Sequence, residues 1–469
     1  MIAIGVVALS VVISFRSVYE PDLGWHLAHG RENMSGRLVR TNIFSSTDPA
    51  YRQRYTSWLS ETTAYAAWRI GGDAGIQALQ AAAIGGALTV VYLACRLWSG
   101  VLPSLSLLVI GFLVIEPRAI PRPHLASFFG LAVVSWIVQR AVAARSAKPL
   151  WWCVPVIALW SNLHSEVVFG VALAAVFAGG ELLRPSALDR GQAVSAIAIA
   201  VACVAALLVN PYGWGLFLYL YENASVPQLL GIAELQPPYL PVYRGFFAYA
   251  AIAVVLLLSF PRRLAVWEIA AAAIFTVLGI RYLRLTPLVF FVTAPMVAAR
   301  LAALTVRGVD ARAMFVTACA AAIVLVRVPL PAMIGGMHLG GAFPEVVYPA
   351  RALAFIEREN LSGPVFNSHN LGGWLEWAEY PRVRVFQDSR LQAYPPERFR
   401  SILDASRSQP QWDALTSGVD WAIVSLARPN ALSGVGRFPA ATWGTVYEDE
   451  AIEILVRRNG RYAALAARQ

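Results

Sequence analysis

Carboxylates and histidines near the first apolar run are the first side chains whose types and spacing could do chemistry. Asp22 lies in VYEPDLGWHLAHGR (18–31), directly after that run. A carboxylate held at the boundary between membrane and water can act as a general base on a substrate hydroxyl or amine. His26 follows four residues later, so on a helix it faces the same way and can orient Asp22. The alternative is a solvated loop acid beside an interfacial ring.

Two further acids follow in FSSTDPAYRQRYTSWLSETTAYAAWRIGG (44–72). Asp48 lies among turn residues, and Glu61 lies among aromatic residues at helical spacing. The spacing predicts an amphipathic helix along the membrane interface. Both acids are candidate catalytic residues, and a helix cap or a surface acid is the alternative for each.

Short links between later apolar runs carry arginines and histidines. EPRAIPRPH (116–124) contains Arg118, Arg122 and His124, SNLHSE (161–166) contains His164, and IRYLRLTP (280–287) contains Arg281 and Arg284. A guanidinium group matches the oxygens of a phosphate, so these residues could bind the phosphate of a lipid carrier. Contact with lipid headgroups is the alternative.

The elements that must position these residues are membrane helices. Of the 469 residues, 58% are hydrophobic and 14% charged, which excludes a soluble globular protein, a disordered chain and a coiled coil. We expect an α-helical polytopic membrane protein with about eleven spans. The expected spans are residues 1–15, 75–95, 101–116, 124–143, 150–163, 165–183, 192–209, 244–260, 264–280, 285–303 and 311–329.

The net charge of +10 falls largely between these runs, so it indicates membrane topology and not a nucleic-acid partner. Alternate links are richer in arginine, which places the N-terminus in the cytoplasm and the protein in the cytoplasmic (inner) membrane. The candidate site residues then all lie at the outer face. One crowded polar face predicts one site there, because polar residues at membrane depth are costly.

Residues 331–469 have a different composition, with helical and strand patterns in alternation, which predicts a small extracytoplasmic α/β domain. Residues 1–330 form the membrane domain, with a large first outer loop at 19–73. The sequence contains no nucleotide-binding loop, serine hydrolase elbow or HExxH pattern. A divalent metal stays undecided, and the four cysteines are interpreted as buried apolar residues.

PDLGWHLAHGR, RPHL, SNLHSEVVFG, ELQPP and IRYLRLTPL follow one another as in a set of bacterial multi-spanning proteins. These proteins resemble GT-C class membrane glycosyltransferases, relatives of protein mannosyltransferases and lipid A aminoarabinose transferases. The resemblance implies an inverting enzyme with Asp22 as catalytic base and a polyprenyl-phosphate sugar donor. It implies donor binding by basic residues such as Arg118, Arg122, His124 and Arg281. The class often has a double-acid motif, whereas Pro21 separates Glu20 from Asp22 here.

The favoured interpretation is therefore a glycosyltransferase that moves a sugar from a polyprenyl-phosphate carrier to an extracytoplasmic glycan, lipid or protein. One alternative is a transporter of lipid-linked glycan, which predicts polar residues in both halves of the membrane. The inner halves are almost wholly apolar. A second alternative is a non-catalytic membrane scaffold that binds a partner through its outer domain.

Overall fold

The computed structural model describes residues 20–53, 56–225, 233–259, 264–306, 308, 310–326, 347–427 and 429–468. The described chain forms two compact units. The helical unit is built from Ile76–Leu216 and the described part of Pro227–Leu339. The α/β unit is built from the described parts of Ser17–Gly75, Phe217–Val226 and Gly340–Gln469. Each unit is therefore assembled from segments that are far apart in the sequence.

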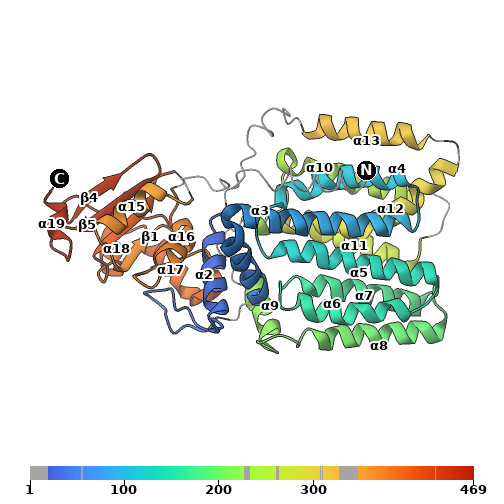
Figure 1. Ribbon diagram of the computed structural model, residues 1–469, viewed down its shortest axis with the longest axis horizontal. Helices are drawn as coiled ribbons and strands as arrows, with labels where there is room; N and C mark the ends of the chain where they lie inside the picture. Colours follow the sequence, from blue (N-terminus) through green and yellow to red (C-terminus); the bar gives the residue numbers. More distant parts are fainter. Residues whose placement is uncertain are drawn as a thin grey trace. The chain divides into compact units, whose positions relative to one another are not determined.

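The helices of the helical unit lie side by side (Figure 1). They are α3 (Trp58–Arg96) from Ile76 onward, α4 (Val101–Ile115), α5 (His124–Ala144), α6 (Cys153–Trp160), α7 (Val167–Leu183), α8 (Arg190–Ala206), α10 (Leu240–Ser259), α11 (Val266–Arg281), α12 (Thr286–Val306) and α13 (Ala311–Val326). Each expected apolar run from 75–95 onward overlaps one of these helices. The expected first span, residues 1–15, lies outside the described residues.

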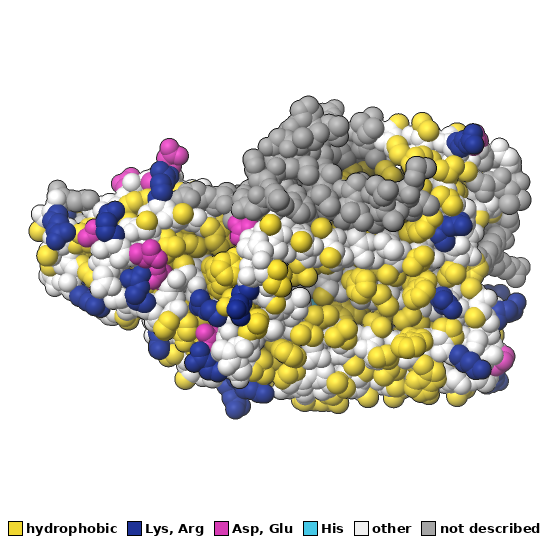
Figure 2. Space-filling view, viewed as in Figure 1, with side chains coloured by type: hydrophobic (Ala, Val, Ile, Leu, Met, Phe, Trp, Pro, Cys, Tyr) yellow, Lys and Arg dark blue, Asp and Glu magenta, His cyan; other side chains and the backbone are white. Residues whose placement is uncertain are grey.

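Five helical segments within the described chain are long and apolar enough to cross a membrane: Trp58–Arg96, Val101–Arg118, His124–Ala144, Leu240–Leu258 and Leu283–Leu304. Shorter apolar helices are Val167–Leu183, Arg190–Ala206 and Ala311–Ala320. The total of about eleven spans thus stays a prediction. On the visible face of the helical unit, hydrophobic side chains cover the middle and Lys and Arg side chains gather at one end (Figure 2).

The core of the helical unit surrounds α12. Its apolar window is 78% buried, against 33% for the window of α10. Phe290 packs edge-on against Tyr249 of α10, and Phe291 packs against Phe128 of α5, with ring centroids 5.4 and 5.3 Å apart. The aromatic contacts therefore tie α12 to helices on two sides.

Helix α3 changes direction at Gly72, whose φ of 56° and ψ of −141° are not helical. Glycine tolerates a positive φ because it has no Cβ. The division between the two units falls directly after this kink, at Gly75. The amphipathic first part of α3 and its apolar continuation are therefore separated by a glycine.

The α/β unit contains a five-stranded sheet of order β2-β1-β3-β5-β4. The strands are β1 (Gly363–Asn367), β2 (Val383–Arg384), β3 (Trp421–Ser425), β4 (Trp443–Glu448) and β5 (Ile452–Arg457). β1 pairs with β2 and β3 in parallel, and β5 pairs with β3 and β4 antiparallel. The helices are α15 (Ala350–Arg358), α16 (Gly372–Glu379), α17 (Pro396–Ala405), α18 (Gln409–Leu415) and α19 (Ala463–Ala466).

Both faces of this sheet are buried. Val365 and Ile423 belong to the core that α15 and α16 join, whereas Phe366 and Val424 belong to the core that α17 and α18 join. Neighbouring residues of one strand point to opposite faces, which explains why β3 is apolar along its whole length. The predicted small α/β domain is thus confirmed.

The first loop belongs to the α/β unit and not to the helical unit, unlike the predicted division. Its helix α2 (Leu23–Met34) packs on α16, where Gly24 and Gly373 let the backbones approach closely. Phe44 O accepts a hydrogen bond from Val385 N (3.0 Å), and Val385 O accepts one from Ser46 N (2.8 Å). The predicted boundary near residue 330 lies outside the described residues and stays a prediction.

Candidate functional site

Asp22 lies at the N-terminal end of α2, half-buried, and Ser389 holds its side chain. The Ser389 hydroxyl donates a hydrogen bond to Asp22 Oδ1. Trp25 Nε1 donates to Ser389 Oγ over 3.1 Å, and Asp22 N donates to Glu20 Oε1 over 3.0 Å. A half-buried, oriented carboxylate is an arrangement that suits a general base.

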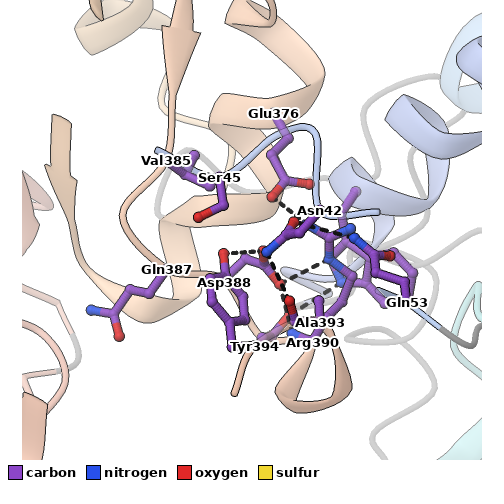
Figure 3. Close-up of polar contacts among 12 residues, drawn as sticks. Asn42, Ser45, Gln53, Glu376, Val385, Gln387, Asp388, Arg390, Ala393 and Tyr394 are labelled. Atoms are coloured by element: carbon purple, nitrogen blue, oxygen red, sulfur yellow. Dashed lines mark hydrogen bonds and ion pairs between the residues drawn. The ribbon is translucent and has the colours of Figure 1, made fainter. Parts of the chain in front are cut away.

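Arg390 is the centre of a buried polar network that also contacts α2. Arg390 Nε and Nη2 donate to the two carboxylate oxygens of Asp388 over 2.9 and 2.6 Å, and Nη2 also donates to Glu376 Oε1 over 2.6 Å (Figure 3). Nη1 contacts His29 Nε2 of α2. Tyr394 OH donates to Asp388 Oδ2 over 2.6 Å. The network therefore joins the segment after β2 to the first loop.

Burial and charge set the protonation states in this network. Burial raises the pKa of Glu376 well above its usual value, although Arg390 opposes the shift. Burial acts in the same direction on Asp388, but Arg390 and the hydrogen bonds to the carboxylate lower its pKa overall. Asp388 is therefore the carboxylate that stays ionised beside Arg390, in contrast to Glu376. Burial, Arg390 and His26 together lower the pKa of His29 well below its usual value.

His26 and Glu61 contact each other in the interior of the α/β unit. Glu61 Oε1 lies 3.4 Å from His26 Nδ1 and 3.4 Å from His29 Nδ1, and the Glu61 side chain is 1% exposed. The structure therefore pairs His26 with Glu61, and the predicted amphipathic helix is the start of α3. Glu61 is enclosed, unlike a surface acid.

Asp48 binds Arg398 of α17. Arg398 Nε and Nη2 donate to the two Asp48 oxygens over 2.8 and 3.2 Å, and Thr47 Oγ1 donates to Asp48 Oδ2 over 2.8 Å. This bidentate pair connects the first loop to the α/β domain. A catalytic role for Asp48 stays a prediction, as it does for Glu61.

The predicted basic residues form a second site, in the helical unit. Arg118 and Arg122 each place Nη1 2.9 Å from Glu234 Oε1. Arg284 Nη2 lies 2.9 Å from Glu166 Oε1, and His164 Nδ1 lies 3.6 Å from Glu166 Oε2. We call these residues the arginine cluster: Arg118, Arg122, His124, His164, Glu166, Glu234 and Arg284.

Electrostatics link the members of the arginine cluster. Burial alone raises the pKa of Glu234, but Arg122, Arg118 and Arg284 lower it far below its usual value. Burial lowers the pKa of His164 to about 4, against the influence of Glu166. His164 is therefore neutral at pH 7, and three guanidinium groups face two carboxylates. Within the cluster as defined, guanidinium groups therefore outnumber carboxylates.

One donor in the cluster lacks an acceptor. Arg118 is 6% exposed, and within the described chain no hydrogen-bond acceptor reaches its buried Nε. A buried guanidinium N–H without a partner costs free energy, so a water molecule or an anion that accepted this hydrogen bond would stabilise the cluster. His124 Nε2 lies 2.8 Å from Arg118 O and helps to fix this backbone.

The structure separates Arg281 from these residues. Arg281 is exposed and its guanidinium lies 5.0 Å from the centre of the Tyr282 ring. Arg284, three residues later in the same link, enters the cluster instead. The sequence patterns did not single out Glu234, Ser389 or Arg390, whereas Arg284 was a candidate together with Arg281. Glu234 lies in the ELQPP segment, and Ser389 and Arg390 lie in the VFQDSR segment, so these polar segments could have indicated them.

Among the described residues, no group of three or more His, Cys, Asp and Glu side chains could hold a metal ion. The question of a divalent metal therefore stays where the sequence left it.

No protein-family model and no curated protein matches this sequence. Oligosaccharyltransferase AglB from Archaeoglobus fulgidus, in complex with an inhibitory peptide and a dolichol-phosphate, matches in structure with a TM-score of 0.62 and 12% identity, over 90% of this chain and 69% of that chain. This chain therefore shares the fold of that oligosaccharyltransferase. The apo form of the Archaeoglobus fulgidus enzyme gives 0.58 and 13% over 90% of this chain and 69% of that one.

A third structure, the same organism's oligosaccharyltransferase in complex with Zn and sulfate, gives a TM-score of 0.56 and 12% identity, over 91% of this chain and 68% of that chain. The predicted resemblance to the GT-C class is confirmed for the fold. At such identities the likeness concerns the fold alone, so the activity must be argued from this chain's own residues.

Proposed function

We propose that this chain is a membrane glycosyltransferase that moves a sugar from a polyprenyl-phosphate carrier to a glycan, lipid or protein acceptor. The observation that carries the proposal is the arginine cluster, in which guanidinium groups outnumber carboxylates and no acceptor among the described residues reaches Arg118 Nε. Guanidinium groups bind phosphate oxygens through charge-assisted hydrogen bonds. The cluster would hold the carrier phosphate before and after transfer.

Asp22 would act as the base. It would accept the proton of the acceptor hydroxyl or amine as that atom attacks the anomeric carbon of the sugar. The bond from this carbon to the phosphate oxygen breaks, and the electron pair leaves with the phosphate. Attack opposite the leaving group inverts the anomeric carbon, so we propose an inverting enzyme. The arginine cluster would stabilise the departing charge.

The similarity to a structure that contains dolichol-phosphate supports a lipid-phosphate carrier. We further propose that the protein lies in the cytoplasmic membrane with its N-terminus inside and residues 331–469 outside. The arginine-rich links support this orientation, because positive residues favour the cytoplasmic side.

Mass spectrometry of the purified protein tests the proposal. We expect a polyprenyl phosphate or its sugar-loaded form to co-purify with the wild type. Asp22→Asn is expected to retain the sugar-loaded donor, because binding persists while proton transfer is lost. Arg122→Ala is expected to retain about 10-fold less carrier or worse, since a charge-assisted hydrogen bond contributes about 1.5–3 kcal/mol.

Arg190→Ala, an exposed arginine of the same unit, is the matched control and should retain the carrier as the wild type does. Absence of any carrier from wild type and Asp22→Asn, with no binding of added undecaprenyl phosphate, would contradict the proposal. The scaffold interpretation would then be favoured. Binding of the sugar-loaded carrier by the wild type without any turnover of that donor would favour a transporter.

A further inference from the structure

The segment that follows β2 contacts α2 and the residue before it through Ser389 and Arg390, and Asp388 holds Arg390 in place. Asp388 accepts hydrogen bonds from the Arg390 backbone N (2.7 Å) and from its guanidinium group. Arg390, 1% exposed, reaches His29, whereas Ser389 reaches Trp25 and Asp22. Ser389 thus lies between two fully buried residues that fix its backbone, and its own side chain faces the N-terminal end of α2.

The hydroxyl of Ser389 has a defined direction. The indole N–H of Trp25 is a donor only, so Ser389 Oγ accepts that hydrogen bond. The hydroxyl has one proton to give, and Asp22 Oδ1 accepts it. The order of donation therefore runs from Trp25 to Ser389 to Asp22, and the relay fixes one carboxylate oxygen in place.

Close packing holds α2 and the 388–390 segment, which carry the two ends of this relay, at a fixed distance from each other. A Cβ on Gly24 would come within 2.3 Å of Gly373 O, so α2 lies directly on α16. A Cβ on Gly372 would come within 2.3 Å of Gln387 O, so α16 also lies directly on the residue before Asp388. These contacts leave α2 and the 388–390 segment little freedom to separate.

We propose that Ser389 is a positioning residue for Asp22, and that the domain after residue 347 thereby orients the base of the transfer reaction. The inference rests on the proposed function, in which Asp22 accepts the acceptor proton. Ser389 itself touches neither substrate nor carrier in this scheme. Its hydroxyl holds Asp22 Oδ1 in the direction that proton transfer requires.

Turnover of the donor identified by mass spectrometry in Asp22→Asn tests the role of Ser389. Loss of a hydrogen bond to a charged group corresponds to a change of about 10- to 100-fold in a rate or equilibrium. We expect Ser389→Ala to lower kcat by about that factor, with KM and the amount of retained donor unchanged. Ser389→Thr keeps the hydroxyl and should recover most of the rate. Ser401→Ala, an exposed serine of α17, is the matched control and should behave as the wild type.

A double-mutant cycle on thermal unfolding tests the contact without any donor. The midpoint shifts of Ser389→Ala and Asp22→Asn should fail to add in the double variant, because the two side chains interact. Additive shifts would overturn the inference. Wild-type kcat in Ser389→Ala, while Asp22→Asn is inactive, would also overturn it and leave the proposed function standing. Wild-type turnover in Asp22→Asn would instead overturn the proposed function.

Discussion

Arg390 shows how single residues connect distant parts of this chain. Its guanidinium group is buried with Asp388 and Glu376 and reaches His29 of the first loop. A buried charge needs partners, because the removal of one member of a buried ion pair leaves the other charge without compensation in the protein interior. Because His29 is one of these partners, Arg390 favours the packing of the first loop against the segment after β2.

The pKa of His29 predicts a pH dependence of stability. Burial, Arg390 and His26 hold it well below 6.5 in the folded protein, and Glu61 lies 3.4 Å from the ring. Below pH 6.5 the unfolded chain binds a proton that the folded protein does not bind. Stability should therefore fall as pH is lowered through 6.5, by up to about 1.4 kcal/mol per pH unit from this group.

Thermal unfolding of detergent-solubilised protein between pH 5 and 8 measures the effect. The midpoint of the wild type should fall more steeply below pH 6.5 than that of His29→Gln, which lacks the titrating ring. Equal slopes for the two proteins would show that His29 is protonated in the folded state or that it lies outside the cooperative unit.

At the scale of elements, the α/β unit depends on one close helix contact. Gly24→Ala would place a methyl group 2.3 Å from Gly373 O, which is backbone and cannot swing away. We expect the free energy of unfolding to fall by about 1–3 kcal/mol, which is usual when extra atoms are forced into a packed core. Gly71→Ala is the matched control, since a Cβ there meets nothing within 4 Å. Thermal unfolding compares the variants, and an unchanged midpoint for Gly24→Ala would refute close α2–α16 packing.

Sequence patterns predicted the elements better than their partners. The apolar runs at 101–116, 124–143 and 165–183 correspond to α4, α5 and α7, because long apolar runs specify helices locally. The alternation of helical and strand patterns after residue 347 likewise predicted an α/β domain, and a five-stranded sheet is present there. The ion pair of Asp48 with Arg398 joins residues 350 positions apart, and periodicity carries no record of such a partner.

The candidate site was predicted in the same uneven way. Arg118, Arg122 and His124 were predicted together and lie together, since nine residues contain all three. Arg281 and Arg284 could be told apart only by the structure, because α11 ends at Arg281 and a short 3₁₀ turn then carries Arg284. Glu234 comes from another link, and its pairing depends on how the helices assemble.

At the scale of the whole molecule, the α/β unit is discontinuous in sequence. Residues 340–469 expressed alone should fold poorly, because Arg390 and Val385 lose their partners in the first loop. A fusion that joins 17–75 to 340–469 should resist protease better. Limited proteolysis of both fragments measures the difference, and equal resistance would show that the domain folds without the first loop.

This discontinuity gives the protein a fixed order of assembly during synthesis. The ribosome needs roughly 15–50 s to make the roughly 265 residues between Gly75 and Gly340, at 5–20 residues per second. Throughout this time His29, Glu61 and the apolar face of α2 have left the ribosome without the segment that covers them. A newly made chain therefore presents an unfinished surface until its last quarter emerges, and a holding factor acting in that interval would raise its yield.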